Sequence, residues 1–171
     1  MSILSSIIDP PAGSTPTSGG LYTPEQRRRR DASRWTLVQG ILAPLQFVVM
    51  IGSAVLIVYS LRTGDALFWA DASVVLKTGL LFTIMVTGAL WERDVYGQYL
   101  FADAFFWEDV VSMGVIALHT AYLIALLGNL LATEARLLLA LVAYAAYGVN
   151  AIQFLLKLRR ARLDARRAES A

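Results

Sequence analysis

Residues 105–123 read FFWEDVVSMGVIALHTAYL, which has the length and apolar character of a membrane-spanning helix. The stretch nevertheless contains Glu108 and Asp109 near its start and His119, the single histidine of the chain, about 16 Å further along a helix. Ionisable groups inside a membrane span are costly and usually serve a function. The stretch therefore predicts a membrane helix that lines a polar site.

The composition of the whole chain also indicates a membrane protein. Of its 171 residues, 57% are apolar and 16% are charged, and the mean hydropathy is +0.56. Soluble domains are usually about 45–50% apolar and about 25% charged. The chain has no cysteine, which excludes disulfides and Cys-ligated metal centres. Four apolar segments are long enough to cross a bilayer, and they lie at roughly 35–61, 69–91, 105–127 and 135–158. We therefore predict an all-α integral membrane protein with a four-helix domain at 23–160.

Basic residues are concentrated at the two ends of the apolar region. Eleven of the fifteen Lys and Arg residues lie either at 27–34 or at 157–167. Basic runs beside apolar spans indicate the cytoplasmic membrane face, and they do so more often than they indicate nucleic-acid binding. Four spans and two basic ends predict that both termini are cytoplasmic.

The termini themselves are predicted to be simple. Residues 1–22 are rich in Pro and Gly and are expected to form a flexible tail, and residues 161–171 a basic cytoplasmic tail. Thr23, Pro24 and Gln26 have the spacing of a helix cap. We expect the helix that starts there to continue through the arginines into the first span.

Polar side chains within the spans fall into two predicted layers. The layer toward the cytoplasm comprises Gln39, Glu92, Glu108, Asp109, Asn150 and Gln153, and the deeper layer comprises Lys77, His119 and Tyr144. Gln46 lies on the same face of the first span as Gln39. Lys77 is expected to snorkel to the outer interface, with pairing inside the bundle as the alternative.

Each polar residue also has a purely structural interpretation. The glutamines can form hydrogen bonds between helices, and the acids can stabilise the start of a helix. His119 can be a core histidine that is bonded to a carbonyl or to Tyr144.

The motifs that are missing restrict the chemistry further. The sequence has no glycine-rich nucleotide loop and no GxSxG motif, and a single histidine cannot supply two axial ligands to a haem. Carboxylates, one histidine, tyrosines and water remain. This set suits acid–base chemistry on a lipophilic substrate or proton-coupled transport.

Several longer stretches are distinctive, and they read YTPEQRRRRDASRWTLVQGILAPLQF, ASVVLKT, FTIMVTGALWE, FFWEDVVS, ALHTAYL and NAIQFLLKLR. In these stretches, from about residue 22 to residue 159, the chain resembles the 2-vinyl bacteriochlorophyllide hydratase family of phototrophic bacteria. The resemblance implies hydration of the C3 vinyl group of chlorophyllide a, or of its vinyl variants, to a 1-hydroxyethyl group in bacteriochlorophyll a biosynthesis. It implies no organic cofactor. The magnesium is part of the chlorin substrate.

The resemblance also implies partners and a location. The partners would be chlorophyllide a and related chlorins, the lipid bilayer and neighbouring pigment-biosynthesis enzymes, with no nucleic acid. The location would be the inner membrane, cytoplasmic or intracytoplasmic, of a phototrophic bacterium. The alternative function is a non-enzymatic four-helix membrane protein that acts as a pigment carrier, an assembly factor or a small proton-coupled transporter.

Vinyl hydration requires an acid that protonates the terminal carbon and a base that takes a proton from the water. Glu108 and Asp109 could divide these roles, because burial can keep one carboxyl protonated while its neighbour stays ionised. Adjacent positions on a helix point about 100° apart, so Glu108 could instead pair with Glu92 and leave Asp109 structural. His119 could act as a relay or as an axial ligand to the substrate magnesium. The residues expected to contact the chlorin are Trp91, Phe105, Phe106 and Trp107, together with Gln39, Gln46, Tyr144, Asn150 and Gln153, and the basic termini could attract its propionate.

Overall fold

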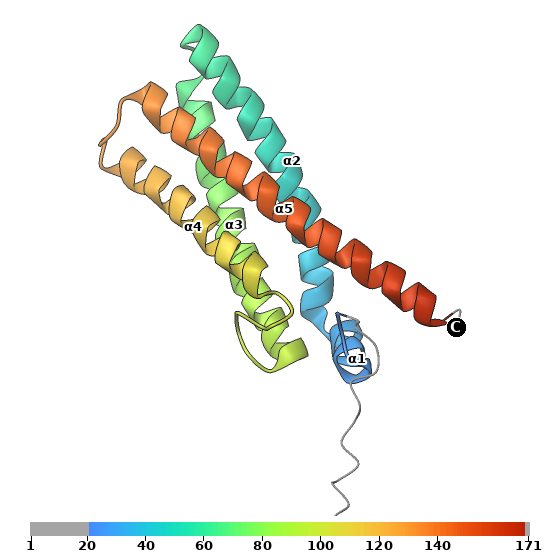
Figure 1. Ribbon diagram of the computed structural model, residues 1–171. Helices are drawn as coiled ribbons and strands as arrows, with labels where there is room; N and C mark the ends of the chain where they lie inside the picture. Colours follow the sequence, from blue (N-terminus) through green and yellow to red (C-terminus); the bar gives the residue numbers. More distant parts are fainter. Residues whose placement is uncertain (1–20, 170–171) are drawn as a thin grey trace, which may run out of the picture.

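The computed structural model describes residues 21–169, which form five α-helices (Figure 1). These are α1 (Pro24–Ala32), α2 (Arg34–Thr63), α3 (Leu67–Tyr96), α4 (Phe106–Leu127) and α5 (Thr133–Glu169), and residues 21–169 contain no strand. The four helices α2 to α5 are each long and apolar enough to cross a membrane. The all-α prediction with four candidate membrane spans is therefore confirmed.

The start of the fold differs from the prediction at Ser33. The predicted capping box is present, since the Thr23 hydroxyl accepts from the Gln26 N–H and the Gln26 side chain accepts from the Thr23 N–H. Ser33, however, has an extended backbone with ψ of 128°, and its hydroxyl accepts from the Trp35 N–H to start a new helix. The expected continuous helix is therefore wrong, because a serine satisfies a free helix end better than it serves a helix interior.

The boundaries of the two predicted tails also change. Tyr22 was assigned to the flexible tail 1–22, but it is buried against Val95 and Phe105. The rest of that predicted tail, 1–20, lies outside the described residues, as do 170–171. At the other end α5 continues without a break to Glu169, because no Gly or Pro interrupts residues 149–169.

The four long helices pack as two antiparallel hairpins. Helices α2 and α3 form the first hairpin and α4 and α5 form the second, and each pair packs more extensively than any contact between the hairpins. The interface between the hairpins, here called the seam, is formed by α2 against α5 and by α3 against α4. Part of the seam is an apolar core that includes Ile57, Val74, Tyr122, Leu137 and Ala140.

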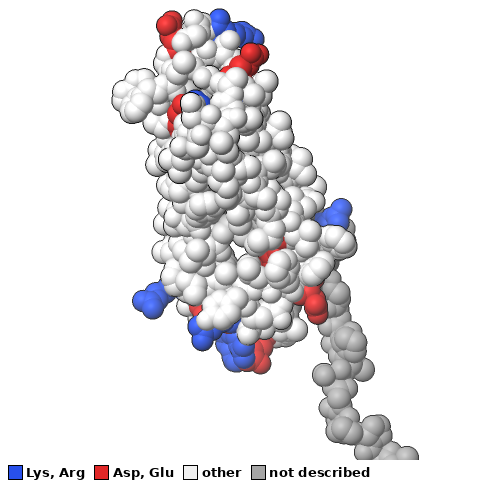
Figure 2. Space-filling model, turned by 90° about the vertical axis from the view of Figure 1, so that its left-hand side faces the viewer, with Lys and Arg blue, Asp and Glu red and all other residues white. Residues whose placement is uncertain are grey.

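The bundle has two distinct ends. Helix α1, the loop 97–105 and the C-terminal turns of α5 lie at one end, here called the arginine end, and the loops 64–66 and 128–132 lie at the far end (Figure 1). Figure 2 shows charged side chains gathered near the ends, with a broad uncharged band between them. Exposed apolar side chains cover α2 to α5, for example Val48, Val55, Val86, Val142 and Leu155. This surface is that of a multi-pass membrane protein.

Candidate active site

A pair of buried carboxyl groups lies near the arginine end of the seam. Glu92 on α3 and Asp109 on α4 are only 5% and 4% exposed, and each accepts a hydrogen bond from one of two consecutive loop residues, Ala102 and Phe101. Two ionised carboxylates in one buried site repel each other, which favours the state in which one of them carries a proton. The pair can therefore supply an acid beside a base.

The loop 97–105 is tied to this carboxyl pair. The Phe101 N–H donates to Asp109 Oδ2 at 2.7 Å, and the Ala102 N–H donates to Glu92 Oε2 at 3.2 Å. Phe101 has φ of 60°, a backbone conformation that a bulky residue adopts only when its surroundings impose it. The bond to Asp109 is one of the contacts that hold it there.

A hollow of about 250 Å³ lies next to the carboxyl pair. It is lined by Leu21, Gln26, Tyr96, Gln98, Ala102, Asp103 and Ala104. Ala102 both lines this hollow and donates its N–H to Glu92. The hollow is large enough for several water molecules. Ala102 alone separates such water from Glu92 along this path.

Glu108 has a different partner from either predicted one. Its Oε2 lies 2.6 Å from Nζ of Lys157 on α5, and the two side chains are 11% and 26% exposed. Pairing of Glu108 with Asp109 or with Glu92 is therefore wrong as a prediction of contacts. Residue 108 lies about 100° around α4 from residue 109, so it faces α5 of its own hairpin while Asp109 faces α3.

The predicted aromatic contacts divide into two groups. Trp91 and the buried Phe105 pack together with 5.7 Å between ring centres, in a cluster that also contains Tyr96 and Phe154. Phe106 and Trp107 are 43% and 71% exposed and lie on the surface of the bundle. The first group is buried or partly buried beside Glu92, whereas Phe106 packs at the surface against Phe101, whose N–H donates to Asp109.

Three other polar residues were predicted to contact the substrate, namely Gln39, Asn150 and Gln153. Two of them form hydrogen bonds between the helices of one hairpin. Gln39 donates to Thr87 Oγ1 at 2.8 Å and to the Ile84 carbonyl at 3.2 Å, which ties α2 to α3. Asn150 donates to Ser112 Oγ at 2.7 Å. Asn150 Oδ1 and Gln153 Oε1 are buried without a hydrogen-bond partner in the described part of the chain.

The deeper polar layer contains Lys77 and Tyr144, as predicted. The Lys77 side chain is fully buried, its Nζ donates to Gln46 Oε1 at 2.5 Å, and Nζ lies 3.9 Å from the centre of the Tyr147 ring. Snorkelling of Lys77 is therefore wrong, because an amide and an aromatic face hold its ammonium inside the bundle. The Tyr144 hydroxyl shares a hydrogen bond of 2.7 Å with Ser53 across the seam.

His119 belongs to the same layer. It is fully buried, and its ring centre lies 5.8 Å from that of Tyr144. Its Nδ1 lies 2.9 Å from the Val115 carbonyl oxygen, so Nδ1 carries the proton and Nε2 has a free lone pair. Nε2 has no hydrogen-bond partner within residues 21–169.

One polar cluster at the far end was not anticipated. Asp71 on α3 accepts from the Tyr122 hydroxyl at 2.6 Å and from Arg136 Nη2 at 2.8 Å. The side chains of Arg136 and Asp71 are 8% and 19% exposed, and the cluster joins α3 to α4 and α5 across the seam. The sequence contained a signal, because the two opposite charges lie at the same depth, just inside the far ends of their predicted spans.

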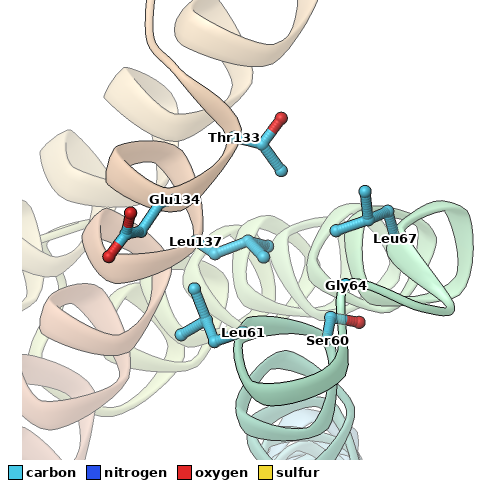
Figure 3. Close-up of a pocket in the computed structure, with 7 residues that line it drawn as sticks. All are labelled: Ser60, Leu61, Gly64, Leu67, Thr133, Glu134 and Leu137. Atoms are coloured by element: carbon cyan, nitrogen blue, oxygen red, sulfur yellow. The ribbon is translucent and has the colours of Figure 1, made fainter.

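A second hollow, of about 210 Å³, lies at the far end (Figure 3). It is lined by Ser60, Leu61, Gly64, Leu67, Thr133, Glu134 and Leu137. It contains neither the carboxyl pair nor His119. Both hollows are smaller than the roughly 300–1,000 Å³ of typical small-molecule sites.

The fold and the buried ionisable side chains are those of a multi-pass membrane protein with acid–base groups in its core. The sequence profile of 2-vinyl bacteriochlorophyllide hydratase matches residues 22–160. The chain belongs to the 2-vinyl bacteriochlorophyllide hydratase family.

Two relatives support this assignment. A 2-vinyl bacteriochlorophyllide hydratase from Cereibacter sphaeroides is 62% identical over 149 residues, which cover 87% of this chain and 92% of the relative. Another, from Rhodobacter capsulatus, is 58% identical over 156 residues, which cover 91% of each protein. No solved structure matches the chain. The resemblance noted in the sequence is confirmed.

Proposed function

We propose that the protein is a hydro-lyase that adds water to the C3 vinyl group of chlorophyllide a or a related vinyl chlorin. Family membership supports hydration of a vinyl bacteriochlorophyllide. The observation that most supports acid–base catalysis is the buried Glu92–Asp109 pair, because it can supply an acid and a base side by side. The product carries a 1-hydroxyethyl group at C3.

The carboxyl pair can complete the reaction and return to its starting state. The protonated member donates its proton to the terminal vinyl carbon, which leaves a cation on the carbon next to the ring. The carboxylate member stabilises this cation, and water then adds to it. The added water gives one proton to the pair, so one carboxyl is protonated again at the end. The protein needs no organic cofactor in this scheme, and the magnesium remains part of the substrate.

The neighbouring ion pair supports these steps electrostatically. After the first proton transfer both Glu92 and Asp109 are negative, and two buried like charges repel strongly. The Lys157 ammonium lies close enough to interact with Asp109 and bonds directly to Glu108. Its positive charge offsets part of that repulsion. Trp91 and Phe105 provide flat apolar surfaces for the chlorin beside the pair.

One assay tests this function directly. The purified protein is incubated in detergent with chlorophyllide a and no added cofactor. A hydratase produces a pigment that is heavier by one water and whose red absorption band is shifted to shorter wavelength, because the vinyl group leaves the conjugated system. A carrier would change the spectrum only while the pigment is bound, and the extracted pigment would keep its mass.

We infer that both termini face the cytoplasm of a phototrophic bacterium and that the spans cross its inner membrane. The positive-inside rule supports this orientation, because the arginine end carries the basic clusters. The chain has no cysteine, so a single cysteine introduced into a loop can be labelled without background and shows on which side of the membrane that loop lies. A membrane-impermeant thiol reagent should label Asp65→Cys and Asn129→Cys from the outside, and Gln98→Cys and Arg166→Cys only after the membrane is opened. The reverse pattern would invert the topology.

His119 is proposed as an axial ligand to the substrate magnesium through its free Nε2. His119→Ala should then weaken binding of the magnesium pigment by about tenfold or more relative to the magnesium-free pigment, a difference of ~1.4 kcal/mol. Fluorescence titration of the protein with each pigment measures both affinities. Equal weakening of the two would make His119 a core histidine.

A further inference from the structure

Lys77 is a buried basic residue. Its side chain is fully buried in the N-terminal half of α3, and no Asp or Glu within residues 21–169 forms a salt bridge with it. The Gln46 carbonyl oxygen and the face of the Tyr147 ring are its polar contacts. A buried charge without an opposite charge is costly, and its presence inside a membrane span indicates a function. The reaction at the carboxyl pair does not use it.

The neighbours of Lys77 also have unused hydrogen-bonding capacity. Gln46 is fully buried, and its Nε2 has no partner among the described residues. Because its Oε1 is bound to Lys77, the amide orientation is fixed, and the Nε2 donor is left free beside the ammonium. Gln46 Nε2 is thus a donor without an acceptor among the described residues, and it lies beside Lys77 Nζ, whose hydrogen bond to Gln46 Oε1 leaves further N–H groups available. This arrangement fits a carboxylate, which has two acceptor oxygens and a negative charge.

We propose that Lys77 and Gln46 form the binding site for the propionate carboxylate of the chlorin substrate. The inference rests on the proposed function, since a chlorophyllide carries this propionate as a free acid. Lys77 Nζ provides the opposite charge and Gln46 Nε2 the second donor. The propionate of the bound substrate is the counter-ion of Lys77, which the protein itself does not supply within residues 21–169.

The spacing along the helices agrees with this assignment. On α5, Tyr147 marks the depth of Lys77, which it contacts, and Lys157 marks the depth of the carboxyl pair, because it bonds to Glu108 beside Asp109. Ten residues separate Tyr147 from Lys157. The Lys77 site and the carboxyl pair therefore lie about 15 Å apart along α5. The vinyl group and the propionate are on neighbouring pyrrole rings, and an extended propionate reaches well beyond the macrocycle. A chlorin that stands along the seam can therefore place its vinyl group at the carboxyl pair and its carboxylate at Lys77.

An esterified propionate has no negative charge and cannot form the ion pair with Lys77. The enzyme should therefore prefer the free acid to an ester.

The experiment compares the free acid of chlorophyllide a with its methyl ester. The dissociation constant of each is measured by fluorescence titration with the wild-type protein, and hydration of each is followed separately. The wild type should bind the acid about 10–100-fold more tightly, as expected for a buried hydrogen bond to a charged group. Binding reports on the Lys77 site and turnover reports on the proposed function. A protein that prefers the acid but hydrates neither pigment would leave this site standing and overturn the hydratase assignment.

Two variants test Lys77 itself. Lys77→Met removes the charge at similar volume, and Gln46→Glu supplies the ammonium with a counter-ion from the protein. Both should bind acid and ester with nearly equal affinity. Their thermal stability should be unchanged or higher, because Lys77→Met removes the uncompensated buried charge and Gln46→Glu compensates it. The acid and the ester partition differently into detergent. This difference cancels when the acid-to-ester ratio of dissociation constants of each variant is compared with that of the wild type.

Lys157→Met is the matched control. It removes a lysine of α5 that lies ten residues from Tyr147, the ring that contacts Lys77. This variant should keep the wild-type preference for the acid even though turnover falls. Retention of that preference in Lys77→Met would overturn the proposal and move recognition of the carboxylate to the basic ends of the chain. Equal binding of acid and ester by the wild type would overturn it as well.

Discussion

Replacing Glu92 with Gln is expected to lower kcat by about 10²–10⁴-fold, the range that general acid–base catalysis typically contributes. Glutamine keeps the shape of Glu92 and can still accept the Ala102 N–H, but it cannot donate a carboxyl proton to carbon. Asp109→Asn should lose activity in the same range for the same reason. Initial rates of hydration, together with circular dichroism and pigment binding of each variant, measure the effect.

The two carboxyls should behave as a unit. Because either single change destroys the shared proton, Glu92→Gln combined with Asp109→Asn should lose little more than the worse single variant. Glu108→Gln is the matched control, since it removes the adjacent carboxyl from α4 but leaves the pair intact. It should lose less activity than Glu92→Gln. Near-normal hydration by Glu92→Gln with a large loss in Glu108→Gln would transfer the acid to Glu108.

Arg136→Met is expected to lower the free energy of unfolding by about 3 kcal/mol, the low end of the range for breaking a buried ion pair. The change leaves the Asp71 carboxylate inside the bundle without its cation, and Asp71 is only 19% exposed. Asp71 also joins α3 to α4 through Tyr122, so the loss affects the contact between the hairpins. Thermal unfolding in detergent, or titration with a denaturing detergent, measures it.

A double variant separates the ion pair from general damage. Asp71→Asn removes the charge and keeps an acceptor for the Tyr122 hydroxyl. Added to Arg136→Met, it should recover most of the lost stability, because no uncompensated charge remains. If the single change Arg136→Met cost nothing, the cluster would not hold the hairpins together.

The spans and the depth of the polar residues could be predicted because both depend on local sequence. Hydropathy identifies a stretch that is long enough to cross lipid, and the fixed rise of a helix converts sequence position into depth. Glu92 and Asp109 were thus assigned to one layer, and His119 and Tyr144 to another, as the structure has them. The break at Ser33 was missed because the same Ser fits a helix turn or a cap, and only the path of the chain decides between these.

The partners could not be predicted, because they depend on how each helix is rotated about its axis. Glu108 and Asp109 are equivalent in sequence and depth, yet one faces α5 and the other faces α3. Lys77 was expected near the interface since a long side chain can usually reach water. The position of Gln46 on the neighbouring helix reverses that expectation, and no pattern within either segment contains this information.

The distribution of the carboxyl pair over the two hairpins has a consequence for access. Glu92 belongs to the first hairpin and Asp109 to the second, and the loop that connects the hairpins is bonded to both. On the proposed mechanism, a pigment that enters from the lipid between the hairpins separates Glu92 from Asp109. The proton donor would then form only after the hairpins close around the pigment, so an open bundle would be unreactive.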